Sequence, residues 1–322
     1  MYLNPKIGHD DIEQIPTRNG YGEGLLELGE LDENVVVLTA DLAESTRAEA
    51  FGKKYPERFI ECGVAEQNMM GIAAGLALYG KVPFVSSYAV FSPGRSWDQL
   101  RVSVCYSKAN VKVAGAHTGI SVGPDGATHQ ALEDIAITRV LPNLTVVVPC
   151  DSIETKKATV ALGQKEGPAY FRFGREKTPV MTTIETPFVV GKAEIFKEGD
   201  DVAIIGSGPV LYNALLAAME LEKQGISCMV VNNHTIKPID IDTIVGVALH
   251  CGAVVTVEEH QVMGGCGSAV AEVLALHQPV PMEMVGMQNT FGESGKPQEL
   301  IEKYGMDVKA VIEAVRRVLK RK

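Results

Sequence analysis

Short runs of β-branched and apolar residues alternate with helical patterns along the first half of this 322-residue chain. The apolar runs predict strands, and the segments between them repeat apolar residues at helical spacing. We predict strands at 35–42, 58–63, 82–88, 111–117, 144–151 and 168–174, and helices at 19–31, 43–54, 65–79, 94–107, 130–138 and 152–165. Strands this apolar, separated by helices, indicate an α/β fold with parallel sheets that are covered on both faces.

The periodicity is lost once, in the segment REKTPVMTTIETPF, which contains Pro179 and Pro187. A second alternating block follows this break. We predict its strands at 201–208, 227–238, 253–260 and 279–287, and a last helix at about 307–320. The chain is therefore expected to form two tandem α/β domains with parallel sheets, residues 1–182 and residues 183–322.

Charge and cysteine content narrow the expected partners and compartment. The chain has 30 basic and 40 acidic residues, a formal net charge of −10, which argues against nucleic acid or an anionic membrane as a partner. No apolar stretch has the length of a signal peptide core or a membrane span. The six scattered cysteines form no CxxC pair, so free thiols in the cytoplasm are expected rather than disulfides or a zinc site.

One carboxylate stands in an unexpected setting. In ECGVAEQNMMG, residues 61–71, Glu66 lies among small and apolar residues where a strand gives way to a helix. Met69, Met70 and Ala73 recur at helical spacing after it, which places Glu66 in or near the first turn. A glutamate there can simply complement the positive end of the helix dipole. This stretch alone leaves a structural and a functional interpretation open.

The loop after the strand at 111–117 is the stronger candidate for chemistry. Residues 115–130 hold four glycines, two histidines (His117 and His129) and Asp125. Ligands of open parallel sheets bind at the carboxyl ends of strands, and His and Asp supply proton transfer and hydroxyl recognition. We therefore favour a binding site over a polar surface turn. Tyr88 and Phe91 end another strand, where they either pack in the core or stack on a flat ring.

Two further glycine-rich turns lie in the second half. The turn Gly206-Ser207-Gly208 lacks the third glycine of a dinucleotide fingerprint and the GK[ST] of a P-loop, so we interpret it as a tight turn. In GGCGSA, residues 264–269, Cys266 lacks the glycine that a nucleophile elbow has two places after the nucleophile, and no base is identifiable. A nucleophilic thiol is therefore disfavoured.

Two of these segments carry a family resemblance. GVAEQNMMGIAAGLA and AGAHTGISVGPDGATHQALED resemble the cofactor-activating segment and the substrate loop of transketolases, and the DGxTHQ core is specific. TRNGYGEGLLEL, LTADLAEST and GPAYFRFGRE extend the resemblance over nearly the whole chain. His117 and Gln130 favour transketolase over related thiamine enzymes. The resemblance implies a pyrimidine-binding domain followed by a transketolase C-terminal domain.

The resemblance also implies a thiamine diphosphate site. Glu66 matches the glutamate that hydrogen-bonds a pyrimidine ring nitrogen and favours the imino tautomer, which then removes the thiazolium C2 proton. A buried carboxylate at a helix start suits this task because it can share a proton. Tyr88 and Phe91 match the aromatic pocket around the pyrimidine, and Asp41 matches an acidic residue beside the cofactor rings.

The substrate positions follow in the same way. His117 and His129 match histidines that bind the donor sugar oxygens and assist proton transfer, and Asp125 matches an aspartate that contacts a sugar hydroxyl. Three further positions match the residues that hold the terminal phosphate of the sugar: Arg18, Ser45 and Arg175. A guanidinium group fits a phosphate well, so the resemblance implies a phosphorylated acceptor.

Two departures from the family pattern change the expected assembly. No GDG motif occurs, although transketolases use one to bind the diphosphate through Mg²⁺. The resemblance thus implies a split enzyme, whose amino-terminal, diphosphate-binding subunit supplies most of the Mg²⁺ site, in a dimer of heterodimers. The second departure is Gly94-Arg95, where many transketolases have another aromatic residue.

Alternatives remain open at this point. The chain could belong to a deoxyxylulose-phosphate-synthase-like enzyme or a 2-oxoacid dehydrogenase, although His117 disfavours the synthase. It could instead be a non-catalytic assembly protein that kept the fold, although Glu66, Asp125 and His129 are all intact. A dedicated pathway with an unusual ketose phosphate is as compatible with the sequence as the pentose phosphate pathway.

Overall fold

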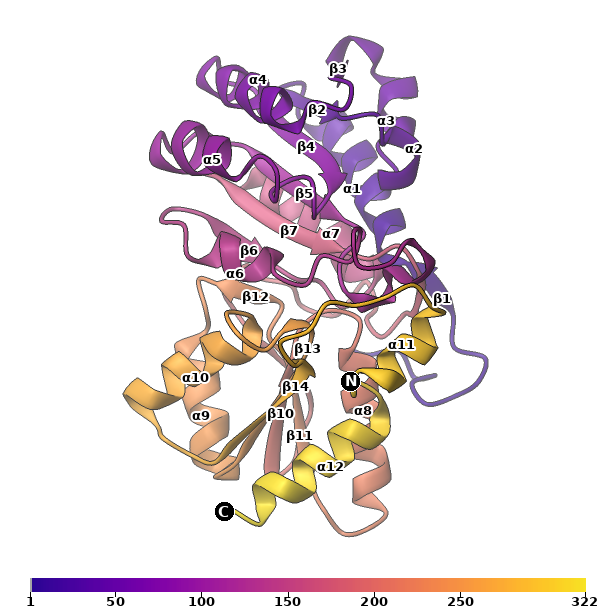
Figure 1. Cartoon of the computed structure of the whole chain (residues 1–322), viewed down its shortest axis with the longest axis vertical. Helices are drawn as coiled ribbons and strands as arrows, with labels where there is room; N and C mark the ends of the chain where they lie inside the picture. Colours follow the sequence, from indigo (N-terminus) through magenta and orange to yellow (C-terminus); the bar gives the residue numbers. More distant parts are fainter. Residues whose placement is uncertain (1) are drawn as a thin grey trace.

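Two sheets organise the chain in the computed structural model, which describes residues 2–322. Figure 1 shows the first sheet and its helices above the second sheet and its helices. The seven-stranded sheet has the order β12-β6-β7-β5-β4-β2-β3, and the five-stranded sheet has the order β14-β13-β10-β11-β9. A separate two-stranded ribbon joins β1 (Gln14–Pro16) to β8 (Lys177–Pro179) in antiparallel register.

The first sheet is built from the strands expected in the first half and one strand from the second half. Its strands are β2 (Val35–Thr39), β3 (Phe59–Glu61), β4 (Val82–Tyr88), β5 (Lys112–Ala116), β6 (Thr145–Val147), β7 (Ala169–Phe173) and β12 (Thr235–Lys237). Its helices are α1 (Thr17–Leu31), α2 (Ala43–Thr46), α3 (Glu49–Lys54), α4 (Glu66–Leu78), α5 (Trp97–Gln99), α6 (Asp134–Arg139) and α7 (Ser152–Gln164). A π-helical segment, Leu100–Tyr106, continues α5, and 3₁₀ segments span Pro56–Arg58 and Ile120–Asp125.

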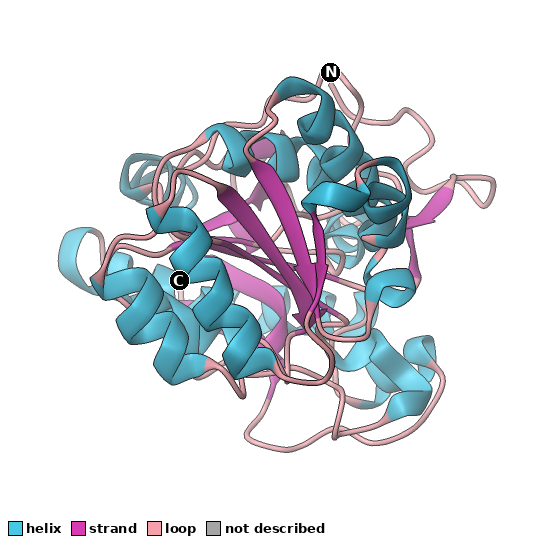
Figure 2. Ribbon diagram, turned by 90° about the horizontal axis from the view of Figure 1, so that it is seen from above, coloured by secondary structure: helices cyan, strands magenta, loops and turns pink. Residues whose placement is uncertain are grey.

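The second sheet repeats the strand–helix alternation. Its strands are β9 (Glu194–Lys197), β10 (Val202–Gly206), β11 (Cys228–Asn232), β13 (Val254–Gln261) and β14 (Met282–Met287). Its helices are α8 (Leu211–Glu222), α9 (Ile241–Cys251), α10 (Cys266–His277), α11 (Pro297–Lys303) and α12 (Val308–Leu319). Figure 2 shows helices on both sides of the central strands, as the apolar strand sequences predict.

The α/β prediction is confirmed, and every pair of neighbouring strands between β2 and β7 in the first sheet is parallel. Strands such as KVAGA in β5 are buried over their whole length, because helices cover both faces. Each sheet nevertheless has one antiparallel edge strand, β12 in the first and β9 in the second. The predicted sheets are therefore mostly, not entirely, parallel.

The predicted single strand at 227–238 is wrong. The chain leaves the second sheet after Asn232, and residues 235–237 cross to the first sheet as β12, which pairs with β6. The Val148 N–H donates a hydrogen bond to the His234 carbonyl at 2.7 Å, just before this crossing strand. An apolar run indicates burial but not the sheet in which it is buried, so the pattern could not distinguish these strands. The boundary near residue 182 stays a prediction.

The predicted helix at 43–54 is also divided. Arg47 takes a left-handed conformation with φ 69°, which ends α2 before α3 begins. A non-glycine residue seldom adopts this conformation, so the sequence pattern gives no sign of the break. After this break the Arg47 side chain points toward residues of other predicted segments.

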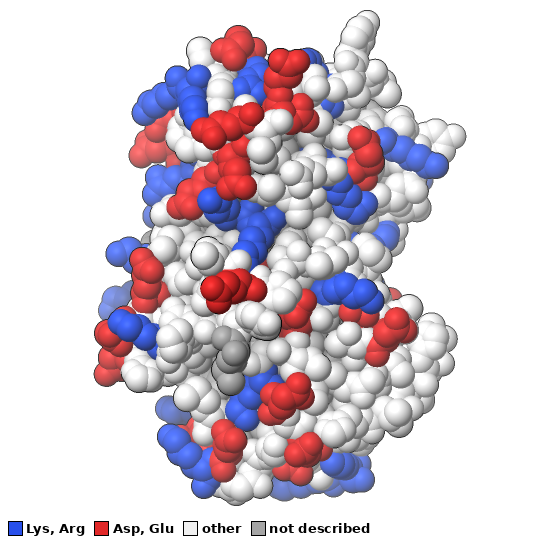
Figure 3. Space-filling view, turned by 180° about the vertical axis from the view of Figure 1, so that it is seen from behind, with Lys and Arg blue, Asp and Glu red and all other residues white. Residues whose placement is uncertain are grey.

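The state of the cysteines and the distribution of surface charge agree with the expectations from the sequence. Within residues 2–322 all six cysteines are free, and five of them are buried. Figure 3 shows acidic and basic side chains interspersed over the face that it displays. In this same part of the chain, no helix combines the length and the apolar character that a membrane crossing requires.

Candidate active site

The carboxyl ends of four adjacent parallel strands bring the predicted site residues to one edge of the first sheet. In the order β2, β4, β5 and β7, these ends lead to Asp41, Tyr88, His117 and Arg175. Parallel pairing places successive strand ends at the same edge, which is where open α/β sheets bind ligands. Residues spread over more than 130 positions therefore share one region.

Glu66 is the first residue of α4, as predicted, and its side chain is only 2% exposed. The carboxylate accepts a hydrogen bond from Arg95 Nη1 at 3.0 Å. The Arg95 guanidinium also lies 4.5 Å from the centre of the Phe91 ring. Arg95 itself is 47% exposed, so this partner is held at the surface while the carboxylate is buried.

Two aromatic rings and two imidazoles form one cluster beside Glu66. The rings of Tyr88 and Phe91 are nearly parallel, with their centres 5.9 Å apart. His117 stacks on Tyr88 at 3.9 Å. His129 meets Phe91 edge-on at 5.5 Å and Tyr88 at 6.1 Å. The aromatic pair and both predicted histidines thus line a common site, although they come from three different segments.

His117 is a neutral imidazole. It is 1% exposed, and burial together with the charges of Arg18 and Arg175 lowers its pKa from 6.5 to about 3. Its backbone takes a left-handed conformation with φ 54°, and its Nδ1 has no hydrogen-bond partner among the described residues. A buried nitrogen without a partner in a strained segment is typical of a group that meets a ligand.

The low pKa of His117 predicts a measurable pH dependence of stability. Between pH 6.5 and about 3 the unfolded chain binds a proton here that the folded chain does not. The free energy of unfolding should therefore decrease as the pH is lowered through this range, by about 1.4 kcal/mol per pH unit from this group. His117→Gln should make the fall shallower by that amount in denaturant unfolding at pH 6 and pH 5. Equal slopes for both chains would contradict the neutral imidazole.

The loop from Thr118 to Ala131 carries the other predicted substrate residues. Asp125 accepts a hydrogen bond from Arg175 Nη1 at 2.8 Å, which links the loop to the end of β7. The Thr128 hydroxyl lies 2.9 Å from His129 Nδ1. The loop therefore presents a carboxylate, a hydroxyl and an imidazole next to the aromatic cluster.

Three guanidinium groups gather at this edge, of which Arg18 and Arg175 were predicted. Arg18 Nη1 donates to the Ser45 carbonyl at 2.9 Å. Arg47 Nη1 lies 3.5 Å from the Glu44 carbonyl, so the two arginines meet neighbouring carbonyls of α2. Burial and the charges of Arg47 and Arg175 lower the pKa of Arg18. The sequence pattern missed Arg47, because only its left-handed backbone brings it here.

Asp41 is placed at the same edge but in a different environment. Its backbone N–H donates to the Glu61 carboxylate at 2.8 Å, and its residue is exposed. No hydrogen bond or ion pair joins its side chain to the other site residues in the described chain. A role beside a cofactor stays a prediction for Asp41.

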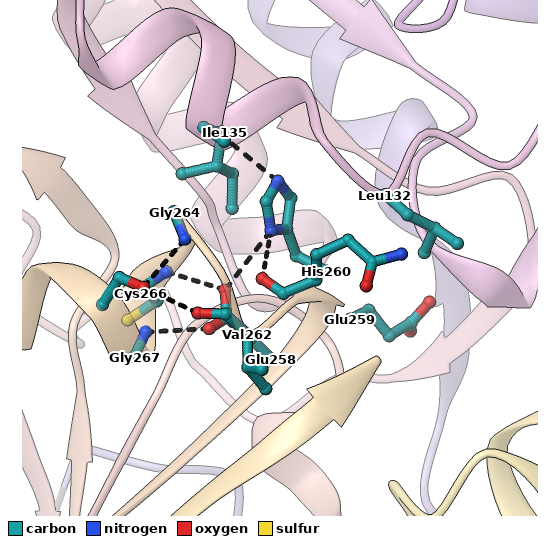
Figure 4. Close-up of polar contacts among 12 residues, drawn as sticks. Leu132, Ile135, Glu258, Glu259, His260, Val262, Gly264, Cys266 and Gly267 are labelled. Carbon is teal, nitrogen blue, oxygen red and sulfur yellow. Dashed lines mark hydrogen bonds and ion pairs between the residues drawn. The ribbon is translucent and has the colours of Figure 1, made fainter. Parts of the chain in front are cut away.

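The corresponding edge of the second sheet is filled by its own side chains. Glu258, in β13, accepts hydrogen bonds from the N–H groups of Cys266 and Gly267 at 2.7 and 2.8 Å (Figure 4). The first turn of α10 is thereby occupied by the chain's own carboxylate. Burial raises the pKa of the Cys266 thiol to about 12, which disfavours a thiolate at this position. Residues 2–322 contain no group of three His, Cys, Asp or Glu side chains able to hold a metal ion.

The arrangement at the first sheet combines three chemical elements. It has a buried carboxylate beside two aromatic rings, the imidazoles of His117 and His129, and a group of guanidiniums. The rings and carboxylate suit a flat heteroaromatic ring with a basic nitrogen. The imidazoles, Asp125 and the guanidiniums suit a hydroxylated molecule with an anionic end.

Comparison with known proteins gives matches over nearly the whole chain. The family model "Transketolase, pyrimidine binding domain" matches residues 13–181, and "Transketolase, C-terminal domain" matches residues 191–311. The chain is 44% identical over 307 residues to a putative transketolase C-terminal section of Methanocaldococcus jannaschii, covering 94% of this chain and 96% of that protein. It is 40% identical over 311 residues to a 6-deoxy-6-sulfo-D-fructose transketolase subunit of Clostridium sp., covering 97% of each.

A solved structure matches as well. It is a split-gene transketolase, an inactive beta4 tetramer, with a TM-score of 0.88 and 46% identity, covering 95% of this chain and 98% of that one. The two tandem α/β domains thus match the pyrimidine-binding and C-terminal domains of these proteins.

Proposed function

This chain belongs to the transketolase family, and from that premise we propose that it is the carboxyl-terminal subunit of a two-chain transketolase. It would transfer a two-carbon ketol unit between sugar phosphates, with thiamine diphosphate as cofactor. The observation that carries the proposal is that the buried Glu66 carboxylate is linked through Arg95 to Phe91, one member of the cluster of two aromatic rings and two imidazoles at one sheet edge.

The residues present fit the pyrimidine end of the cofactor. Two nearly parallel rings and a buried carboxylate with one surface partner suit a flat ring that carries nitrogen donors and acceptors, and the buried Nδ1 of His117, whose ring stacks on Tyr88, has no partner in the described chain. Tyr88 and Phe91 would hold the ring, and Glu66 would hold a proton at its nitrogen. When bound, thiamine diphosphate supplies the carbanion that attacks a ketose. We assign the diphosphate and Mg²⁺ to the partner subunit.

The substrate would be held by the remaining groups. A neutral His117 can accept or donate a hydrogen bond at a sugar oxygen without first losing a proton at working pH. His129 would act beside it, and Asp125 would bind a sugar hydroxyl. Arg18, Ser45 and Arg175 would hold the terminal phosphate. We add Arg47 to this group because its guanidinium, like that of Arg18, contacts a backbone carbonyl of α2.

The proposed assembly is a dimer of heterodimers with an amino-terminal, diphosphate-binding subunit. The similar split-gene protein is inactive as a beta4 tetramer, which supports the idea that such chains need a partner. The chain alone is therefore expected to be inactive. The buried free thiols fit the cytoplasm, where thiols stay reduced.

The test is an assay of ketol transfer from xylulose 5-phosphate to ribose 5-phosphate, with thiamine diphosphate and Mg²⁺. We would measure the chain alone, the candidate partner alone, and their mixture. We expect turnover in the mixture only. Full activity of the isolated chain would contradict the split assembly.

The same mixture separates the alternatives. Turnover of pyruvate instead of the ketose would favour a synthase or a 2-oxoacid dehydrogenase. Cofactor binding without turnover of phosphorylated ketoses would direct the assay to sulfonated ones, because guanidiniums bind both anions and one relative acts on 6-deoxy-6-sulfo-D-fructose. A mixture that binds no cofactor would favour a non-catalytic assembly protein.

A further inference from the structure

The substrate loop of the first half rests on the second half of the chain. The loop from Thr118 to Ala131 lies beside three segments of that half: the end of β13, the loop before α11, and the start of α11. In Figure 1, α11 lies at the level where the two halves meet. A side-chain carbon on Gly123 would lie 3.0 Å from Pro297, and one on Gly126 would lie 2.6 Å from the Ser294 hydroxyl. The loop is thus packed closely on residues of the second half that do not belong to the candidate active site.

Glu259 supports the beginning of this loop. The side chain is buried, and its carboxylate accepts the Ser121 N–H at 3.1 Å. A side-chain carbon on Gly119 would lie 2.1 Å from the same carboxylate oxygen, so the loop backbone passes directly against it. Gly119 has φ +83°, which favours glycine for a second reason. Glu259 therefore fixes the backbone two residues after His117.

Gln130 supports the end of the loop. It is 2% exposed, and its amide nitrogen lies 3.2 Å from the Ile120 carbonyl, 3.3 Å from the Gly123 carbonyl and 2.9 Å from the Glu293 carbonyl. One side chain thus joins both ends of the loop to the segment before α11. Because Gln130 follows His129 directly, the position of that imidazole depends on these bonds.

We propose that Glu259 and Gln130 are positioning residues, through which the second half of the chain sets the placement of His129 and Asp125 for ketol transfer. This inference rests on the proposed function. Neither side chain touches the aromatic cluster in the described structure, so both would act through the loop backbone. A displacement of about 1 Å at a reacting group can cost about 100-fold in rate, which is the scale expected when such a support is lost.

The neighbouring residue provides a matched control. Glu258 and Glu259 are consecutive in β13, both are buried, and both accept backbone N–H groups. Their side chains point in opposite directions in Figure 4, Glu258 toward α10 and Glu259 away from it. Burial raises the pKa of both carboxyl groups. The two positions thus share chemistry and burial, but only Glu259 supports the substrate loop.

The experiment compares Glu259→Ala, Glu259→Gln, Gln130→Ala and Glu258→Ala in the chain mixed with its diphosphate-binding partner. Glu259→Ala and Gln130→Ala should lower kcat/KM for the sugar phosphates by about 10- to 100-fold, with the thiamine diphosphate Kd unchanged. Glu259→Gln should recover most of the loss, because its amide oxygen can still accept the Ser121 N–H. Glu258→Ala should lower the unfolding midpoint but leave kcat/KM within about twofold, since its carboxylate contacts the start of α10 and His260 and makes no bond to the substrate loop.

A second readout does not depend on turnover. Amide hydrogen exchange of the full chain should accelerate about tenfold or more in residues 118–131 of Glu259→Ala, and in residues 264–270 of Glu258→Ala. Equal activity losses for the two alanine variants, or unchanged exchange of 118–131 in Glu259→Ala, would overturn the proposal. If the wild-type mixture turns over neither phosphorylated nor sulfonated ketoses, the proposed function has failed, and the exchange result still decides whether Glu259 holds the loop.

Discussion

Glu66→Gln is expected to lower kcat of the assembled enzyme by about a thousandfold, while the chain still folds and still binds its partner. A glutamine keeps the size and one acceptor oxygen, but it cannot share a proton with a ring nitrogen as a carboxylate can. The buried position of Glu66 keeps water from replacing it, because its side chain is only 2% exposed. Steady-state rates of ketol transfer, with circular dichroism and thermal unfolding beside them, measure this result.

The same substitution tests the structural interpretation of Glu66. If the residue only complements the helix dipole, Glu66→Gln should cost about 0.3–1 kcal/mol of stability and leave the rate nearly unchanged. Glu49 gives the matched control, since it is also an acidic residue in the first turn of a helix but pairs with Lys53 at the surface. Glu49→Gln should leave kcat within about twofold. A rate loss of similar size in both variants would contradict the cofactor role.

Arg175→Ala is expected to lower kcat/KM for a phosphorylated acceptor by about 100-fold and for the matching unphosphorylated sugar by much less. A charge-assisted contact to a phosphate is lost in the first case only, and removing one member of such a pair costs about 2–5 kcal/mol. Initial rates with ribose 5-phosphate and with ribose measure the difference. Arg316→Ala, which removes a surface guanidinium bonded to Gln224, should change neither value.

The prediction for Arg175 has a counterpart that tests the added arginine. Arg47→Ala should shift the same selectivity in the same direction, because Arg47 contributes to the positive field that lowers the pKa of Arg18. Equal losses on phosphorylated and unphosphorylated sugars would show that these arginines hold the fold rather than the phosphate. The Asp125–Arg175 ion pair would explain equal losses, since without it the loop would be released and the binding of both sugars would weaken.

The local features of the site could be predicted from sequence, because each depends on neighbouring residues. Glu66 at a helix start, Tyr88 at a strand end and the glycine-rich loop after β5 follow from periodicity and from the rule for parallel sheets. Their proposed roles come from the family resemblance and not from the spacing.

The features that could not be predicted from the sequence depend on contacts between distant segments. Arg47 reaches the site through a left-handed backbone that its sequence does not favour, and Glu259 lies 138 positions from the Ser121 N–H that it accepts. Residues 228–237 read as one strand because both of their sheets are apolar. The periodicity of a segment predicts which of its residues are buried, but it does not predict which other segment covers them.

The pairing of β12 with β6 has a consequence for biosynthesis. A nascent chain that has emerged from the ribosome only as far as residue 182 holds six of the seven strands of the first sheet and leaves the β6 edge unpaired. An open edge is prone to pair with other chains, so the early intermediate needs protection until residues 235–237 emerge. By then β10 and β11 have also emerged completely, so the two halves would complete their folding together rather than in succession.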